Sequence, residues 1–172
     1  MGSANTVSSW AFNISCSSAR RLRDCLPGEA PNYVDFRTIN QNHMLKTGIL
    51  NPDINSLLSR VRHTNLIVIA DRGFPFWPAI ETVDISLVDG IPTVLQVLEA
   101  IRSNFQIGQA WMAREFLGKN SSKIRAVFSE ALHGVRLRYE PHIKFKLRVP
   151  KAIGLIRTAD TIQYANVILE SA

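Results

Sequence analysis

The sequence predicts an α/β fold: a three-layer α/β/α domain with a mixed central sheet, preceded by an N-terminal extension. Segments with apolar residues three and four positions apart alternate with short apolar runs that are rich in β-branched residues and bounded by Gly or Pro. Helices that alternate with strands pack as layers around one sheet. The chain has 172 residues, 46% of them hydrophobic, which is enough for one sizeable core.

Residues 1–43 differ from the rest and are expected to form a poorly ordered extension. They are rich in Ser, contain no acidic residue before Asp24 and show no clean apolar periodicity. Such a segment buries too little surface to offset the entropy cost of ordering. A misassigned start upstream of Met44 and a transit peptide are the alternatives. Residues 44–172 are predicted to be the single domain.

The first helix and strand of the domain are predicted from local patterns. Asn-Pro-Asp at 51–53 is typical of a helix start, and apolar residues at i, i+3, i+4 and i+7 from Ile54 to Val61 indicate a short amphipathic helix. The run 66–70 is short, uncharged and followed by Gly and Pro, so it predicts a buried strand.

The later elements are expected from the same two periodicities and from caps such as Ser before a helix and Gly after it. They are a strand over 82–87, a helix over 93–105, a short strand over 109–113, a helix within 120–134 ended by Gly134, a strand over 135–141, a helix over 142–152, and two strands over 152–158 and 166–171.

Composition excludes several classes of protein. Cys16 and Cys25 are the two cysteines, which rules out a disulfide framework and a four-cysteine zinc site and fits a reducing, cytoplasmic compartment. No apolar run approaches the roughly 20 residues that span a bilayer, so no membrane partner is expected. No metal or cofactor motif is present, and none is predicted.

The chain is basic, with a net charge of +6. Ten basic residues fall between Lys119 and Arg157 against only Glu130 and Glu140. They are spread over several expected helices and strands without a nucleic-acid motif, so no nucleic-acid partner is expected. A solvated face, or a site for anionic or polyhydroxylated small molecules, is the preferred interpretation.

Polar residues flank the expected buried strand at both ends. His63 precedes it and Asp71 follows it, roughly 25 Å apart at about 3.3 Å per residue. Each also has a purely structural interpretation: His63 could be a C-terminal helix cap, and Asp71 a cap of the loop through Gly73. A third polar residue, His142, could simply be the first residue of a helix. His43 and His133 are expected on the surface.

Several motifs together resemble the D-ribose pyranase family, also called RbsD/FucU. They are "MLKTGILNPDINSLLSRVRHTNLIVIADRGFP", "VDISLVDGIPTVLQVLEAI", "HIKFK" and "IRTADTIQYANVIL", in family order and spacing over residues 44–170. The segment "DISLVDGIPTVLQVL" is closer to the ribose branch than to the fucose mutarotase branch.

The resemblance implies a role for seven residues. His63 matches the catalytic acid/base, and the substrate-binding positions are Asp71, His142, Lys146, Tyr164, Ala165 and Asn166. Two departures adjoin the site: Arg62 stands where glycine is usual, and Arg72 where a small residue is common. They put the preferred sugar in doubt, but not the type of reaction.

The function implied is interconversion of pyranose and furanose forms of an aldose, with D-ribose as the expected monosaccharide and without metal or cofactor. L-Fucose mutarotase and a non-catalytic monosaccharide-binding accessory protein are the alternatives. The resemblance also implies a homo-oligomer, a pentameric ring or a decamer of two stacked rings, with sites at subunit interfaces. Residues at opposite ends of one strand need not then meet within one subunit.

Overall fold

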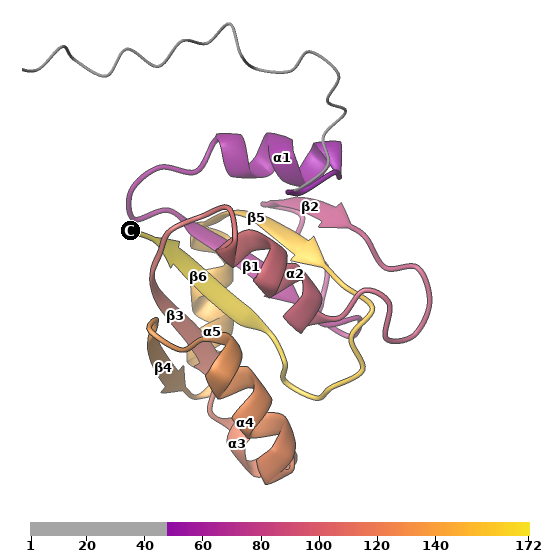
Figure 1. Cartoon of the computed structure of the whole chain (residues 1–172), viewed down its shortest axis with the longest axis vertical. Helices are drawn as coiled ribbons and strands as arrows, with labels where there is room; N and C mark the ends of the chain where they lie inside the picture. Colours follow the sequence, from indigo (N-terminus) through magenta and orange to yellow (C-terminus); the bar gives the residue numbers. More distant parts are fainter. Residues whose placement is uncertain (1–47) are drawn as a thin grey trace, which may run out of the picture. The chain divides into compact units, whose positions relative to one another are not determined.

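A six-stranded mixed sheet forms the centre of the domain (Figure 1). The computed structural model describes residues 48–172, so the expected extension lies outside the described residues. The strands are β1 (Leu66–Ala70), β2 (Glu81–Asp84), β3 (Ile107–Ala113), β4 (Arg136–Glu140), β5 (Ala152–Arg157) and β6 (Val167–Ser171). Their order is β2-β5-β1-β6-β3-β4, and β6 runs antiparallel to both neighbours while the other pairs are parallel.

Helices cover both faces of the sheet, which confirms the three-layer prediction. They are α1 (Pro52–Ser59), α2 (Val94–Arg102), α3 (Glu115–Lys119), α4 (Ser122–Ala131) and α5 (His142–Arg148), followed by a 3₁₀ turn at Val149–Lys151. Helices α1 to α4 contribute to one hydrophobic core, whereas α5 contributes to the core on the opposite face. In Figure 1, α2 and α4 accordingly lie in front of the sheet and α5 behind it.

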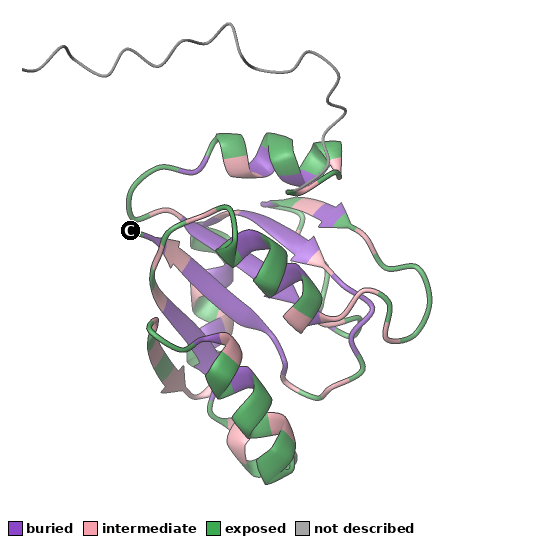
Figure 2. Cartoon of the chain, viewed as in Figure 1, coloured by how far each residue is buried: buried purple, intermediate pink, exposed green. Residues whose placement is uncertain are grey.

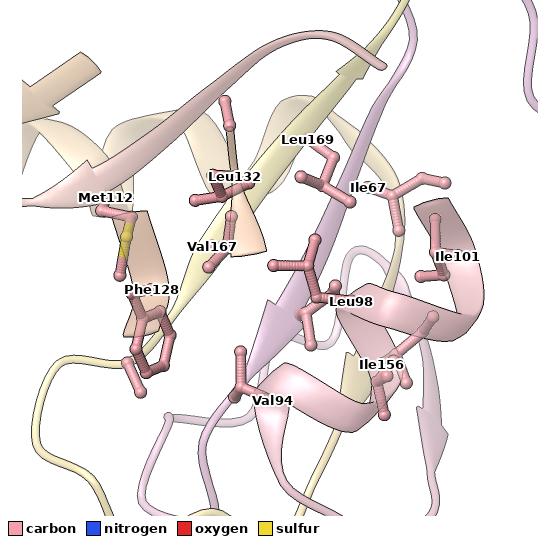
Figure 3. Close-up of a cluster of buried hydrophobic side chains, with 14 of the residues drawn as sticks. Ile67, Val94, Leu98, Ile101, Met112, Phe128, Leu132, Ile156, Val167 and Leu169 are labelled. Carbon is pink, nitrogen blue, oxygen red and sulfur yellow. The ribbon is translucent and has the colours of Figure 1, made fainter. Parts of the chain in front are cut away.

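Strand β1 is buried on both faces, as the sequence predicts. Ile67 and Ile69 point into the core beneath α2 and α4, and Leu66, Val68 and Ala70 point into the core beneath α5. A strand covered on both faces has no solvent side, which explains its continuous apolar sequence. Figure 2 shows the buried central strands, and Figure 3 shows the larger core, where Ile67 lies near side chains of α2 and β6.

Local caps fix the helices that cover this core. The Asn51 side chain accepts hydrogen bonds from the Asp53 and Ile54 N–H groups, which confirms the predicted start of α1. Helix α1 packs so closely on β5 that a Cβ at Gly154 would collide with the Leu57 side chain. Gly134 lies just after α4 with φ +80°, a conformation that favours glycine.

Two differences from the predicted elements matter for the site. The strand expected over 82–87 ends at Asp84, and residues 85–92 form a loop that the Gly90 N–H ties to the Ala159 carbonyl at 2.8 Å. Helix α3 is not predicted at all, since five residues are too few to show helical periodicity.

The topology brings several loops together at the carboxyl edge, which is the end of the sheet at which the parallel strands finish. Strands β1 to β5 run in the same direction, so their carboxyl ends share an edge with the start of the antiparallel strand β6. Residues that follow the parallel strands and residues that precede β6 are therefore neighbours. Ligand sites of open α/β sheets lie at such an edge.

Candidate active site

A cleft with a volume of about 340 Å³ opens at this carboxyl edge. It is lined by five of the seven residues predicted for the site: Asp71, His142, Lys146, Tyr164 and Asn166. A larger groove of about 610 Å³ lies between α2 and α4 but is lined by none of the seven. We place the candidate site in the smaller cleft, because carboxylate, amide, phenol, imidazole and ammonium groups converge there as a polyhydroxylated ligand requires.

Asp71 and Asn166 meet because β1 and β6 are paired. Asp71 follows β1 and Asn166 precedes β6, and the register places Ile69 opposite Val167. The Asp71 N–H donates to Asn166 Oδ1 at 2.7 Å, and Asn166 Nδ2 donates to Asp71 Oδ2 at 2.8 Å. Burial raises the pKa of the Asp71 carboxyl, although the hydrogen bonds from Asn166 and from the Gly73 N–H oppose the rise. Both residues of this pair line the cleft.

His142, Lys146 and Tyr164 also line the cleft. His142 is the first residue of α5, and its backbone N–H donates to both carboxylate oxygens of Glu115, at 3.1 and 2.9 Å. Its ring meets Tyr164 edge-on, with centroids 4.9 Å apart. Lys146 follows one helical turn later. Burial, and next the Lys146 charge, lower the pKa of His142, which favours a neutral imidazole at pH 7.

The His142 imidazole also carries an uncommitted polar atom. Its Nε2 is buried and has no hydrogen-bond partner among residues 48–172. Tyr164, which stacks edge-on against this ring, has φ 58°, an uncommon conformation for a residue with a side chain. Such outliers persist where the surroundings fix them and are frequent at ligand sites.

The structure places Ala165 and His63 outside the cleft. Ala165 is fully buried in the core beneath α2 and α4, so its side chain does not face the cleft. His63 is exposed and lies before β1, at the opposite edge of the sheet from Asp71. Within one subunit the structure therefore does not bring His63 to the other predicted residues.

The turn that carries His63 is held firmly. The Arg62 N–H donates to Asn65 Oδ1 at 2.8 Å, and the Asn65 N–H returns to the Arg62 carbonyl at 3.0 Å. The Thr64 N–H donates to the Ser171 carbonyl at 3.3 Å, and the Ser171 hydroxyl donates to the Arg62 carbonyl. These bonds hold Thr64 at φ 66°, which is unusual for a β-branched residue.

The structural alternatives for these residues have mixed outcomes. Asp71 does cap its loop, since the Gly73 N–H donates to Asp71 Oδ1 at 3.0 Å, and His142 does begin a helix. His63 is not a helix cap, because α1 ends at Ser59 and Arg60 is its C-cap. Asp71 and His142 therefore combine a local structural role with a position in the cleft.

Two further cleft residues, Asp160 and Arg72, are not among the predicted binding residues. Asp160 is buried and ties the site to α2: its Oδ2 accepts from the Val94 N–H at 2.9 Å and its Oδ1 from the Ile162 N–H at 2.8 Å. Its proximity in sequence to Tyr-Ala-Asn is the signal that could have indicated it. The sequence indicates Arg72 only as a departure from the family pattern.

Residues 48–172 offer neither a metal site nor a membrane-spanning helix. No three His, Cys, Asp or Glu side chains of residues 48–172 are arranged so that they could hold a metal ion. None of the helices from α1 to α5 is long and apolar enough to cross a membrane.

Comparisons with known proteins identify the family. Residues 44–172 match the model of the RbsD / FucU transport protein family. D-ribose pyranase of Geobacillus kaustophilus is 38% identical over 128 residues, which cover 74% of this chain and 93% of that protein. D-ribose pyranase of Pectobacterium carotovorum is 34% identical over 133 residues, or 73% and 96% of the two chains.

Two solved structures have a fold similar to that of this chain. Bacillus subtilis RbsD, complexed with D-ribose, superposes with a TM-score of 0.70 at 29% identity over 75% of this chain and 98% of that one. The fucose mutarotase of Streptococcus pneumoniae, in complex with L-fucose, has a TM-score of 0.61 at 22% identity, over 71% and 92% of the two chains, and thus shares the fold. The chain described here belongs to the RbsD/FucU family.

Proposed function

We propose that this protein is an isomerase that interconverts the pyranose and furanose forms, and the anomers, of D-ribose. One observation supports the proposal above others: the five residues that match the family's sugar-binding positions line one cleft although they come from three separate segments. They are Asp71 after β1, His142 and Lys146 on α5, and Tyr164 and Asn166 before β6. The relatives named above as D-ribose pyranases, 34–38% identical to this chain, favour ribose over fucose.

The reaction requires two proton transfers for each ring opening. A proton is delivered to the ring oxygen O5 while the proton of the anomeric hydroxyl is removed, so the C1–O5 bond breaks and C1 becomes an aldehyde. The O4 hydroxyl then attacks C1, and its proton moves to the former carbonyl oxygen, which gives the furanose. Imidazole is the side chain that most readily donates and accepts protons near neutral pH, and we assign this role to His63.

The cleft residues hold the sugar during these steps. The Asp71 carboxylate accepts hydrogen bonds from sugar hydroxyls, and Lys146 and Asn166 supply donors and acceptors. The uncommitted Nε2 of His142 is available to another hydroxyl. The tripeptide that includes Ala165 contributes through its backbone, since the Ala165 side chain is buried.

The separation of His63 from the cleft supports a homo-oligomer, either a pentameric ring or a decamer, in which His63 reaches the cleft of a neighbouring subunit. Large apolar side chains beside the cleft are left uncovered in one subunit: Phe76 is 71% exposed, Ile143 74% and Leu147 70%. Ile143 and Leu147 directly follow His142 and Lys146 on α5. Exposed apolar side chains grouped around a site favour a protein interface there.

We place the enzyme in the cytoplasm.

Loss of a cleft side chain should weaken sugar binding. Asn166→Ala and His142→Ala are each expected to cost about 1 to 3 kcal/mol of affinity, because each removes a hydrogen-bond partner and leaves a sugar hydroxyl unpaired in a partly desolvated cleft. Calorimetric titration with D-ribose measures the effect. His133→Ala, which alters an exposed histidine outside the cleft, should bind as the wild type does. Unchanged affinity in both cleft variants would place the site elsewhere.

Saturation-transfer NMR with D-ribose and L-fucose tests the proposed function itself. Transfer between the pyranose and furanose signals of D-ribose should accelerate in proportion to added protein. Faster exchange of L-fucose anomers alone would indicate a fucose mutarotase. Binding of ribose without faster exchange would indicate an accessory protein that binds monosaccharides.

A further inference from the structure

We propose that Glu115 is a positioning residue for His142: its carboxylate fixes the start of α5 and so holds the imidazole where it meets the sugar. The inference rests on the proposed function, because it concerns a sugar-binding position of the same cleft. Among residues 48–172, those that line the cleft include none of α3, so Glu115 acts on the cleft through α5 rather than by touching a ligand.

The sheet brings Glu115 to the start of α5. Strands β3 and β4 are parallel neighbours, and their register places Ala113 opposite Glu140. The Arg114 N–H donates to the Glu140 carbonyl at 2.7 Å, which keeps the segments that leave the two strands side by side. Helix α3 then begins at Glu115 and α5 at His142. The carboxylate therefore reaches α5 although the two residues are 27 positions apart in sequence.

Helix α5 has no N-terminal cap of its own. The residue before it is Pro141, which makes no side-chain capping hydrogen bond. The first N–H groups of a helix have no partner within the helix. The Pro141 carbonyl accepts from the N–H groups of Lys144 and Phe145, at 2.8 and 3.0 Å, whereas the His142 N–H donates to both carboxylate oxygens of Glu115. Hydrogen bonds to a carboxylate are stronger than those to a neutral acceptor, so Glu115 supplies the missing cap.

The position of the His142 imidazole depends on this cap, because the ring and the capped N–H belong to one residue. The ring lies edge-on to Tyr164 and tilted against Phe145, with centroids 4.9 and 6.2 Å away. Its Nε2 is buried and has no hydrogen-bond partner within residues 48–172. Without the Glu115 carboxylate the first turn of α5 frays and the ring loses this fixed place. A hydrogen bond from the imidazole to a sugar hydroxyl then weakens, since its strength falls steeply with poor geometry.

The carboxylate of Glu115 also acts on the His142 ring through its charge. Although burial raises the pKa of Glu115, the hydrogen bond from the His142 N–H and nearby positive charges hold it below its usual value, so the carboxylate is ionised at pH 7. Burial, and next Lys146 on the same helix, lower the pKa of His142, while the charges of Glu115 and Asp71 raise it. Replacing Glu115 by a neutral residue should therefore lower the pKa of His142 further.

Calorimetric titration with D-ribose tests the positioning role. Glu115→Ala should weaken affinity about 5-fold, because the imidazole is no longer held in place. Glu115→Gln should stay within about 2-fold of the wild type, since its amide oxygen still accepts the His142 N–H. In a His142→Ala background, Glu115→Ala should cost less than it does alone, because the imidazole that it positions is absent. A role in general stability would give the same loss in both backgrounds.

NMR of isotope-labelled histidine, without sugar, provides the second measurement. The His142 signal is identified by its loss in His142→Ala. In Glu115→Gln this signal should titrate at a lower pH than in the wild type. Glu130→Ala is the matched control: it removes the same charge from an exposed residue of α4 that does not line the cleft, and it should change neither ribose affinity nor the His142 titration.

The inference is wrong if Glu115→Ala binds ribose as the wild type does, or if the titration of His142 is unchanged in Glu115→Gln. The second result needs neither sugar nor turnover, so it decides the matter even where Glu115→Ala does not fold. Failure of the proposed function is distinguishable, because it is seen in the wild type. A wild-type protein that binds ribose without faster exchange contradicts only the function, while the two Glu115 variants still report on the positioning of His142.

Discussion

His63→Ala is expected to slow protein-catalysed exchange of ribose forms by about 10²-fold or more, without loss of fold or assembly. The imidazole is exposed and belongs to neither hydrophobic core, so its removal leaves packing unchanged. The bonds that hold the turn over 62–65 involve backbone groups and the side chains of Asn65 and Ser171, not the imidazole. The loss is therefore one of proton transfer alone.

Three measurements on this variant separate chemistry from structure. Saturation-transfer NMR gives the exchange rate, light scattering gives the assembly, and titration shows whether ribose still binds. His133→Ala is the matched control, since His133 is also an exposed histidine and should exchange ribose at the wild-type rate. An unchanged rate in His63→Ala would show that another group performs the acid/base step.

The backbone around His63 supports a functional role independently of the motif. Thr64 has φ 66°, and hydrogen bonds from the last strand hold it there. A left-handed β-branched residue costs free energy that the surroundings must supply, which is frequent at functional sites. These bonds thus fix the backbone of the turn that carries His63.

Much of the fold could be predicted because its signals are local. The run 66–70 is a buried strand for the reason that its sequence suggests, and the helix start at Asn51 has the expected cap. Helix α5 was also predicted, despite the β-like composition of "HIKFKLRV". Periodicity and caps act within about one or two turns of chain, so one sequence shows them.

The contacts that make the cleft are not local, and the periodic pattern could not predict them. Asp71 and Asn166 are 95 residues apart in sequence and meet through the β1/β6 register. The loop over 85–92 alternates like a strand, but it leaves the sheet after Asp84. Glu115, which holds the backbone of His142, belongs to the short helix that no periodicity revealed. The resemblance to a family named the cleft residues; the register of the sheet explains why they meet.

A second large effect is expected when two impaired variants are combined. His63→Ala keeps an intact cleft but lacks the acid/base, and His142→Ala keeps His63 but binds ribose weakly. If each site joins the cleft of one subunit to His63 of a neighbour, mixed oligomers contain some sites in which neither part is altered. Random mixing in equal amounts gives about a quarter of all sites in that form.

The measurement is ribose exchange by saturation-transfer NMR on oligomers formed by co-expression of the two variants, with ribose well below saturation. The predicted result is recovery to at least about a quarter of the wild-type rate, above the rate of either variant alone. Separately prepared variants, combined only after assembly, are the control and should show no early recovery. A rate for the co-expressed oligomers equal to the mean of the two variants would contradict a site shared between subunits, because every site would then retain one defect.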